Sequence, residues 1–339
     1  MGLRGFGLLV LLALGALPTA RGETRLFIAF WNVENLFDTA NDPLVEGDEE
    51  FTPTADKKWT EERLGEKLTN LAKVISEMNA GRGPEVLGLS EIENRAVLEM
   101  LVARLAPLAR AYEIVHQDSP SGRGIDCALL FDRNRLTLAR HDFLRSTVTD
   151  TRDVVEAQLT FEGAPLTVFV NHWPSRVGDQ TGEQRETVAA RLRQRIDELL
   201  AADRTADIVV LGDLNDHPHD ASVARRLGAT ISASSMPAAS TQPTALVNTV
   251  WPIHVRGEIG SYKYDGRWEM IDHVIISQGL IDPRGLSWKP DSTAVFVRDF
   301  MLYKPGTPDA RPNRSYGGDR YYGGYSDHLP VVCELVAQP

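Results

Sequence analysis

The sequence predicts an α/β protein with more than one β-sheet and with helices on the outer faces of the sheets. Three observations lead to this prediction. Short apolar runs of the strand type outnumber the segments with helical periodicity. The helical segments are spread along the chain between groups of strands, which is typical of sheets covered by helices. No linker-like composition and no repeat interrupts the chain, so we expect one folded domain over residues 23–339.

Helices are predicted over three segments, residues 60–78, 95–106 and 183–203. In the first and the third, apolar side chains recur at every third or fourth position and therefore share one face of the helix. Two glutamates lie in the first turn of the first helix, where the helix dipole favours negative charge. Each of these helices can therefore cover a face of a sheet.

Strands are predicted where apolar residues run without interruption or alternate with polar ones. The segments are 25–37, 84–94, 112–118, 124–132, 138–145, 154–163, 165–173, 206–216, 270–277 and 329–336. Residues 229–263 are predicted to be rich in loops, and residues 304–325 to be irregular.

The first 22 residues predict a secretory signal peptide. Arg4 precedes a twelve-residue apolar run, and small residues follow at the expected cleavage point. We expect cleavage after Gly22, with Ala20 as the second choice, and an uncleaved anchor is the alternative. The run is short for a membrane span, and no later stretch approaches the required length. We therefore expect a secreted or periplasmic protein without stable membrane insertion.

The chain is acidic, which limits the partners that it can attract. Its formal net charge is −11, and it becomes −13 without the first 22 residues, because these hold two arginines and no acid. An acidic surface does not attract polyanions over long distances. This charge disfavours tight binding of long nucleic acid, although divalent cations or a local basic patch can reverse the sign inside a cleft.

The only two cysteines, Cys127 and Cys333, each lie within an apolar strand segment. Export permits a disulfide, but a chain of this size does not need one. We expect two buried free thiols, because cysteine is among the most buried residue types.

Polar residues stand at one end of six predicted strands. They are carboxylates, amides and imidazoles: Asn32 with Glu34, Glu91, Asn171 with His172, Asp213 with Asn215, Asp272, and Asp327 with His328. A single residue of this kind at a strand end is most often a turn former or a structural histidine. Six together are harder to explain in that way. If these ends converge on one edge of packed sheets, they build a polar pocket on rigid elements.

The densest of these groups is DIVVLGDLNDHPHD, residues 207–220. An EF-hand calcium loop that starts at Asp213 requires glycine at its sixth position and glutamate at its twelfth, but Pro218 and Ala224 stand there. The stretch is therefore not a loop of this type, and we interpret it as a strand that ends at a catalytic edge.

Side chains alternate along a strand, so Asp213 and Asn215 should point to one side and Leu214 back into the protein. The residues that follow are interpreted as a turn outside the site: Asp216, His217, His219 and Asp220.

Known catalytic motifs narrow the chemistry. The chain has no glycine-rich phosphate loop, cysteine-pair zinc pattern, Gly-x-Ser-x-Gly elbow or dinucleotide fingerprint. Histidines, carboxylates and amides together suit hydrolysis assisted by a hard divalent cation. Mg²⁺ prefers one or two carboxylates, water and substrate phosphate, so the set points to cleavage of a phosphate ester.

Seven motifs occur in the order and spacing of a known family. WNVENLFD, LSEIEN, GIDCALLF, VNHWPSR, GDLND, IDHVIIS and SDHLPVV resemble the motifs of the endonuclease/exonuclease/phosphatase superfamily, which includes pancreatic deoxyribonuclease and exonuclease III. The likeness covers residues 25–336, and the combination of GDLN with a terminal SDH is specific. The resemblance implies a four-layer α/β sandwich, in which two mixed β-sheets pack face to face with helices on the outer faces and the active site lies at one edge.

The resemblance also implies a metal site and a water-activating group. Glu91 is similar to the main Mg²⁺ ligand, with Asn32 beside it and Asp327 as a second metal or water ligand; Mn²⁺ can substitute. Asp213 is similar to the residue that orients or deprotonates the attacking water, and Asn215 to the one that stabilises the charge developing on phosphorus.

Substrate contacts follow from the same resemblance. His328, held by Asp272, would contact the phosphate, and His172 would bind phosphate or protonate the leaving oxygen. Substrate-binding roles are expected for three residues: Asn171, Ser175 and Arg176. For Arg176, an exposed turn residue is the alternative. Asp126 is expected as a buried carboxylate behind the site or as a purely structural one.

Departures from other branches narrow the substrate. SDHLP disfavours the inositol polyphosphate phosphatases, and export disfavours abasic-site repair enzymes. Sphingomyelinase-like members dock on membranes through exposed apolar hairpins, for which residues 246–253 and 315–328 are the candidates. The tyrosines of the latter could instead stack on bases, or be ordinary loop residues.

We therefore predict a secreted, monomeric, Mg²⁺-dependent phosphodiesterase or endonuclease that acts on nucleic acid. A lipid or small-molecule phosphoesterase on the same scaffold is the alternative. A catalytically silent binding module is disfavoured, because Glu91, Asp213 and His328 are all present.

Overall fold

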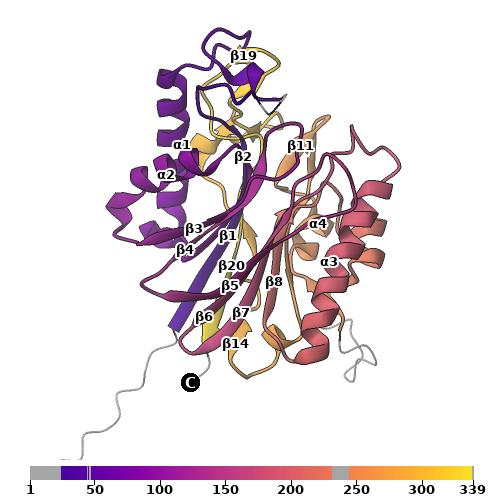
Figure 1. Ribbon diagram of the computed structural model, residues 1–339. Coiled ribbons are helices and arrows are strands. Elements are labelled where there is room, and N and C mark those ends of the chain that lie inside the picture. Colours follow the sequence, from indigo (N-terminus) through magenta and orange to yellow (C-terminus); the bar gives the residue numbers. More distant parts are fainter. Residues whose placement is uncertain (1–23, 44, 46, 231–243, 338–339) are drawn as a thin grey trace, which may run out of the picture.

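The computed structural model describes residues 24–43, 45, 47–230 and 244–337. Two mixed β-sheets pack face to face, and helices cover the outer face of each sheet (Figure 1). The predicted signal peptide, residues 1–22, lies outside the described residues. Within the described part, none of the helices has the length and apolar character that a membrane crossing requires.

The first sheet has the strand order β14-β20-β1-β2-β4-β3, with β15 paired to β20. Its strands are β1 (Thr24–Leu36), β2 (Val86–Ile92), β3 (Tyr112–His116), β4 (Asp126–Asp132), β14 (Leu286–Trp288), β15 (Ala294–Val295) and β20 (Val331–Ala337). β1 and β2 run parallel, and the other pairs are antiparallel.

The second sheet has the order β5-β6-β7-β8-β13-β10-β9. Its strands are β5 (Leu136–Leu144), β6 (Val154–Phe161), β7 (Ala164–His172), β8 (Ile208–Asp213), β9 (Ala229–Thr230), β10 (Leu246–Asn248) and β13 (Asp272–Ile276). β7 and β8 run parallel, as do β9 and β10. The C-terminal ends of β7 and β8 therefore lie at the same edge of this sheet.

The remaining elements are helices and short hairpins. The α-helices are α1 (Glu61–Gly81), α2 (Arg95–Arg104), α3 (Glu183–Ala202) and α4 (Trp251–Arg256), and a π-helical turn spans Ala221–Arg226. Short 3-10 turns span Glu49–Phe51, Ala106–Leu108, Gly279–Ile281 and Asp299–Met301. Three two-stranded hairpins are β11 (Tyr262–Tyr264) with β12 (Arg267–Glu269), β16 (Leu302–Tyr303) with β17 (Arg311–Pro312), and β18 (Tyr316–Gly317) with β19 (Arg320–Tyr321).

Three apolar clusters hold the four layers together. The central cluster joins the inner faces of the two sheets, with residues of β1 and β20 facing residues of β7, β8 and β13. A second cluster packs α1 and α2 on the outer face of the first sheet, and a third packs α3 on the second sheet (Figure 1). A Cβ on Gly88 of β2 would lie 3.2 Å from the side chains of Phe30 and Val170, so glycine allows close contact of the sheets there. The predicted four-layer sandwich is confirmed.

One of the two candidate membrane-docking segments needs correction. Residues 246–253 form β10 and the first turn of α4, and most of their side chains are buried, so they are not an exposed membrane-docking hairpin. The stretch 315–328 holds the β18–β19 hairpin, in which Tyr316 is buried. Both cysteines are buried and free, as predicted.

Candidate active site

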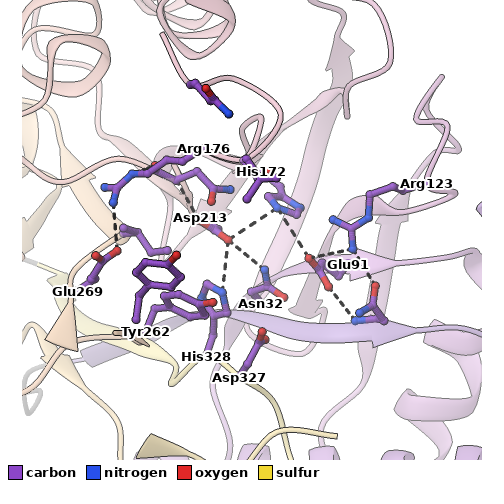
Figure 2. Close-up of a pocket in the computed structure, with 17 residues that line it drawn as sticks. Asn32, Glu91, Arg123, His172, Arg176, Asp213, Tyr262, Glu269, Asp327 and His328 are labelled. Carbon is purple, nitrogen blue, oxygen red and sulfur yellow. Dashed lines mark hydrogen bonds and ion pairs between the residues drawn. The ribbon is translucent and has the colours of Figure 1, made fainter. Parts of the chain in front are cut away.

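A cavity of about 540 Å³ opens where the C-terminal ends of β2, β7 and β8 meet (Figure 2). Among the predicted site residues, the following line it: Asn32, Glu91, His172, Ser175, Arg176, Asp213, Asn215, Asp327 and His328. The structure thus gathers side chains from both sheets at one edge. Asn171 and Asp272 are the predicted site residues that do not line the cavity.

Strand register positions the central acidic residue. Asp213, the last residue of β8, pairs with His172 of β7 on one side and with Asp272 of β13 on the other. Residues paired in register project to the same face of a sheet, so three titratable side chains stand side by side. As expected from the alternation, Leu214 is fully buried and Asn215 lines the cavity.

Asp213 is buried and surrounded by partners. Its Oδ2 atom accepts a hydrogen bond of 3.0 Å from the Asn32 amide, and Oδ1 accepts one of 3.0 Å from the backbone N–H of Asn215. Burial, reinforced by the charge of Asp272, raises the pKa of Asp213 to about 7, although the nearby His328 acts in the opposite direction. The group can therefore exchange a proton near neutral pH.

His328 forms a pair with Asp272, whose carboxylate Oδ2 lies 2.8 Å from Nδ1 of the imidazole. The other ring nitrogen, Nε2, lies 3.7 Å from Asp213 Oδ2. Burial disfavours the imidazolium, but the charges of Asp272 and Asp213 outweigh it and raise the pKa of His328 well above its usual value. Asp272 therefore does not need to face the cavity, since it acts by holding His328 in its charged form.

His172 has the opposite electrostatic setting. Its Nε2 atom lies 3.7 Å from Asp213 and 4.0 Å from Glu91, while Nδ1 is buried without a hydrogen-bond partner. Burial, followed by the charges of Arg152 and Arg123, holds the pKa of His172 well below its usual value. The two histidines of the cavity therefore differ in charge at neutral pH.

Glu91 sits at an irregularity in the sheet. The register of β2 with both of its neighbours shifts here, and Glu91 has a left-handed φ of 62°. Such a bulge redirects a side chain and is costly for a residue other than glycine, so it persists where the surroundings enforce it. Oε2 accepts a hydrogen bond of 2.9 Å from the backbone of Asn35, and Oε1 has only Arg123 at 3.5 Å and His172 at 4.0 Å.

Asp327 is held by the segment before β20 and by a basic partner. Its carboxylate accepts a hydrogen bond of 2.7 Å from Arg314, which lies 3.7 Å from Glu34. Behind them the buried Lys67 ammonium donates to Ser315 and to the backbone of Tyr325. Burial and the charge of Asp327 raise the pKa of Glu34 to about 7. Glu34 was predicted together with Asn32 as a polar group at a strand end. It does not line the cavity, but it lies beside the arginine that binds Asp327.

Asn171 does not stand where a substrate could reach it. Its side chain is fully buried, donates to Leu211 O at 3.1 Å and accepts from Trp173 Nε1 at 3.1 Å. Because neighbouring residues of a strand point to opposite faces, His172 in the cavity requires Asn171 to point away from it. The expected substrate contact of Asn171 is thus corrected to a structural one.

Arg176 and Ser175 line the rim of the cavity. The Arg176 guanidinium donates to Asn215 O at 2.9 Å and to Glu269 at 3.1 Å, and lies 3.7 Å from Asp216. Arg176 is neither a free substrate-binding residue nor a simple exposed turn residue. Its side chain faces the cavity, but acidic side chains already pair with it. It can still approach a bound anion, since its side chain is partly exposed.

Several cavity residues carried no signal in the sequence. Arg123 lies in the loop before β4, and its guanidinium contacts Asn35 at 2.9 Å and Glu91. The ring of Tyr262 packs against that of His328 at a tilt of 34°, with ring centroids 4.8 Å apart, and Tyr264 is exposed at the rim. The expectation that the tyrosines of residues 315–328 stand at the site is wrong, because none of them lines the cavity; the tyrosines that do so come from β11. Of the stretch 315–328, only Asp327 and His328 line the cavity.

The turn after the site also differs in detail from the expectation. Asp216 is buried, accepts a hydrogen bond of 2.6 Å from Ser222 and pairs with Arg185 at 2.9 Å. His217 and His219 stack on one another outside the cavity. These residues are therefore not part of the cavity, as expected, but Asp216 anchors the turn in the core.

Two sets of side chains in or beside this cavity could hold a divalent metal. Asp213, Asp272 and His328 place one ligand atom each within 4.8 Å of one another, but the Asp272–His328 hydrogen bond occupies atoms of two of them. The residues predicted as ligands, Glu91, Asp327 and Asn32, offer hard oxygen donors to the cavity, and Glu91 Oε1 has no close hydrogen-bond donor. Oxygen donors of this kind fit Mg²⁺ better than a set that includes imidazole.

Comparisons with known proteins agree with this architecture. The family model described as "Endonuclease/Exonuclease/phosphatase family" matches residues 27–337. No curated protein matches the chain by sequence. Among solved structures, D. rerio TDP2 complexed with single strand DNA product has a TM-score of 0.55 at 17% identity, covering 92% of this chain and 99% of that one.

Two further structures share the fold. The human Nocturnin catalytic domain with bound sulfate has a TM-score of 0.55 at 16% identity, over 92% of this chain and 94% of that one. A mannosyl-6-phosphatase of Bacteroides thetaiotaomicron has a TM-score of 0.56 at 15% identity, over 92% of this chain and 99% of that one. Because the family model matches most of its length, this chain belongs to the endonuclease/exonuclease/phosphatase family, whose members are metal-dependent phosphoesterases and nucleases.

Proposed function

We propose that this protein is a secreted, Mg²⁺-dependent phosphodiesterase that hydrolyses nucleic acid by in-line attack of water on phosphorus. One observation carries the proposal: Asp213, with a pKa raised to about 7, and His328, paired with Asp272, face the same cavity as Glu91. This set supplies a proton acceptor, a cationic donor and an anionic metal ligand, which are the groups that phosphate-ester hydrolysis needs.

Asp213 is proposed to accept the proton of the attacking water. Its pKa of about 7 lies near the working pH, where a general base is most effective. The hydrogen bonds from Asn32 and from the backbone of Asn215 fix the carboxylate without filling all of its acceptor positions. Asn215 is proposed to donate to the charge that develops on phosphorus.

The two histidines are proposed to contact the phosphate and the leaving oxygen. His328 is kept as an imidazolium by Asp272, so it can bind an anionic phosphate oxygen through Nε2. His172 has a low pKa and is neutral, so it suits hydrogen-bond donation to a phosphate or leaving oxygen better than service as a charged acid.

Glu91, with Asn32 and Asp327 nearby, is proposed to hold Mg²⁺, and Mn²⁺ is expected to substitute. A bound divalent cation would neutralise charge on the phosphate oxygens. Four carboxylates line the cavity, Glu91, Asp213, Glu269 and Asp327, against the cationic Arg123, Arg176 and His328. A bound cation would therefore favour the entry of an anionic substrate.

Nucleic acid is the substrate class that the rim of the cavity favours. Tyr262 and Tyr264 line the cavity and are proposed to stack on bases, and Arg123 and Arg176 are proposed to contact the phosphate backbone. The TDP2 structure that shares this fold holds a DNA product, which agrees with this substrate class. A small-molecule phosphoesterase is the second candidate, because another protein of this fold is a mannosyl-6-phosphatase.

The setting of the enzyme is part of the proposal. Residues 1–22 are proposed to direct export to the periplasm or the medium, and the mature chain is proposed to act as a monomer. An exported enzyme of net charge −13 would then depend on its metal and its few local cations to bind nucleic acid.

A substrate panel tests this proposal. The purified chain of residues 23–339 should cleave plasmid DNA or RNA faster than sphingomyelin vesicles or mannose 6-phosphate. EDTA should abolish the activity, and Mg²⁺ or Mn²⁺ should restore it. Asp213→Asn protein, purified in the same way, controls for contaminating nuclease.

Two results would contradict the proposal. Faster turnover of mannose 6-phosphate or sphingomyelin would assign the enzyme to the small-molecule or lipid alternative. Full activity in EDTA would remove the metal from the mechanism while leaving the fold assignment intact.

A further inference from the structure

A second cavity, of about 100 Å³, lies apart from the catalytic one and is strongly acidic. It is lined by Asp42, Val45, Asp48, Glu93, Asn94, Asp118, Ser119, Gly124 and Asp126. Five of these nine residues are carboxylates, and none of the described residues that line it is basic. The catalytic cavity differs, because two arginines and two histidines stand among its acids.

Asp48 is the feature that points to a ligand. Its side chain is fully buried, and its Oδ1 atom has no hydrogen-bond partner among the described residues. Oδ2 accepts a hydrogen bond from the backbone of Asp42, and the carboxyl group also faces that of Glu93. Burial, with the charges of Asp38 and Asp42, raises the pKa of Asp48, whereas its hydrogen bonds with the Asp42 backbone and the Glu93 carboxyl lower it. A buried carboxylate oxygen without an N–H donor, such as Oδ1, is costly.

The segment that leads into β4 brings two more carboxylates to the cavity. Asp126 is buried, accepts a hydrogen bond of 2.9 Å from the backbone of Ser119, and has its second oxygen 3.4 Å from His116. The exposed Asp118 completes a group with these two, since one ligand atom of each of His116, Asp118 and Asp126 lies within 4.8 Å of the others. Carboxylates from three separate parts of the chain thus line the cavity.

We propose that this second cavity is a binding site for Ca²⁺. Ca²⁺ accepts six to eight oxygen ligands in flexible geometry and tolerates many carboxylates, whereas Mg²⁺ retains most of its water and takes only one or two. The volume of about 100 Å³ is several times the ~10–15 Å³ that a single water requires, so the cavity has room for an ion with water ligands. Asp48 and Asp126 are the proposed buried ligands, and the half-buried Glu93 and the exposed Asp118 complete the set.

The site would tie together parts of the chain that are distant in sequence. The loop around Asp48 already packs on the segment that leads into β4, because a Cβ on Gly47 would lie 2.6 Å from the backbone of Arg123. Gly124, with a left-handed φ of 62°, leaves room for the side chain of Val45. A cation here would therefore fix the segment that carries Arg123 toward Glu91, without itself belonging to the catalytic cavity.

Ion binding can be measured without catalysis. The chain of residues 23–339 with Glu91→Gln, which removes the proposed catalytic ligand, is titrated with Ca²⁺ by calorimetry after treatment with chelator. One site is expected, and saturating Ca²⁺ should raise Tm by about 3 °C. Adding Asp48→Asn should weaken binding at least 30-fold, and adding Asp118→Asn about 5-fold, because that ligand is exposed.

Matched controls separate loss of ligand from loss of fold. Asp142→Asn removes an exposed carboxylate of β5, on the other sheet, and should leave Ca²⁺ affinity unchanged. Asp118→Asn tests the site even if Asp48→Asn fails to fold. Unchanged Ca²⁺ binding in both site variants would overturn the proposal, and equal affinity for Mg²⁺ would overturn the assignment to calcium. These outcomes do not depend on whether the enzyme cleaves nucleic acid.

Discussion

Strands β2 and β8 each have an acidic residue at both ends, and the two ends hold their acids differently. Glu85 and Asp207 immediately precede the two strands, whereas Glu91 and Asp213 lie at their C-terminal ends. All four side chains have low exposure. The residue types are therefore the same at the two edges, and only the surroundings differ.

At the N-terminal end of β2, donors surround the carboxylate. Glu85 accepts from Arg110 at 2.7 Å and from the backbone of Phe27 at 2.8 Å, with Asn79 at 3.3 Å and Arg135 at 3.6 Å. A buried charge that is paired in this way supports the fold, and removing one partner is expensive.

At the C-terminal end, the carboxylates retain unused acceptor positions that face a cavity. Glu91 Oε1 has only Arg123 and His172 at 3.5 and 4.0 Å, and Asp213 has a pKa raised to about 7 by burial and by Asp272. Within β2, saturation by donors, rather than residue type or burial, separates the structural Glu85 from Glu91. In β8, Asp207 and Asp213 both have few donors, and only Asp213 lines the catalytic cavity.

Asp213→Asn should have the largest effect. The amide keeps the size of the side chain but cannot accept the proton of water, so kcat should fall by about 1,000-fold or more. Steady-state hydrolysis of DNA under saturating Mg²⁺ measures this. The unfolding midpoint in urea should not fall, because the substitution removes a buried charge. A loss of activity below tenfold would show that another group accepts the proton.

Exchanging glutamate for glutamine at the two ends of β2 tests the comparison directly. Glu91→Gln should lower kcat/KM by about 100-fold while leaving the free energy of unfolding within about 1 kcal/mol, because its donors are few. Glu85→Gln should do the reverse. It should lower the free energy of unfolding by about 3 kcal/mol, because Arg110 and Arg135 lose a charged partner, and leave kcat unchanged in the folded protein.

Urea unfolding and kinetics on the same two preparations provide the measurement. Equal losses of stability in both variants would mean that the two ends of β2 are held alike, and the distinction drawn from their hydrogen bonds would not stand.

Much of this site could be predicted because strands carry strong local signals. Apolar runs located β2, β7, β8 and β13, and the polar residues at their ends were found by position alone. Alternation along the strand correctly separated Asp213 from Leu214. The same rule applies to Asn171 and His172, which are adjacent and cannot both face the cavity, so the error at Asn171 was avoidable.

Other residues could not have been found from local sequence. Arg123 lies in a loop without periodicity, and its place beside Glu91 depends on packing against residues almost 80 positions earlier in the chain. Tyr262 belongs to β11 and contacts His328, but it lies in residues 229–263, which were predicted to be rich in loops. Arg152 lowers the pKa of His172 from a buried position that no motif marks. The positions of all three residues depend on contacts between parts of the chain that are distant in sequence.

Asp207→Asn should give the smallest effect and extends the comparison to β8. Burial raises the pKa of Asp207 from 3.8 to about 7, opposed by a single hydrogen bond of 3.1 Å from the backbone of Leu286. The folded state thus retains a proton that the unfolded state releases between about pH 4 and pH 7. The stability that this carboxyl contributes is present at low pH and is lost as pH rises through 7.

Asparagine does not titrate and can still accept the hydrogen bond from Leu286. The variant should therefore be more stable than the parent chain by about 2 kcal/mol at pH 8, and the difference should shrink toward zero near pH 4.5. Urea unfolding of both proteins at pH 8, 6 and 4.5 measures it. A difference that stays constant with pH would mean that Asp207 is ionised throughout. The charge of Asp207 would then be stabilised as well as that of Glu85, and the acids that precede β2 and β8 would be held in the same way.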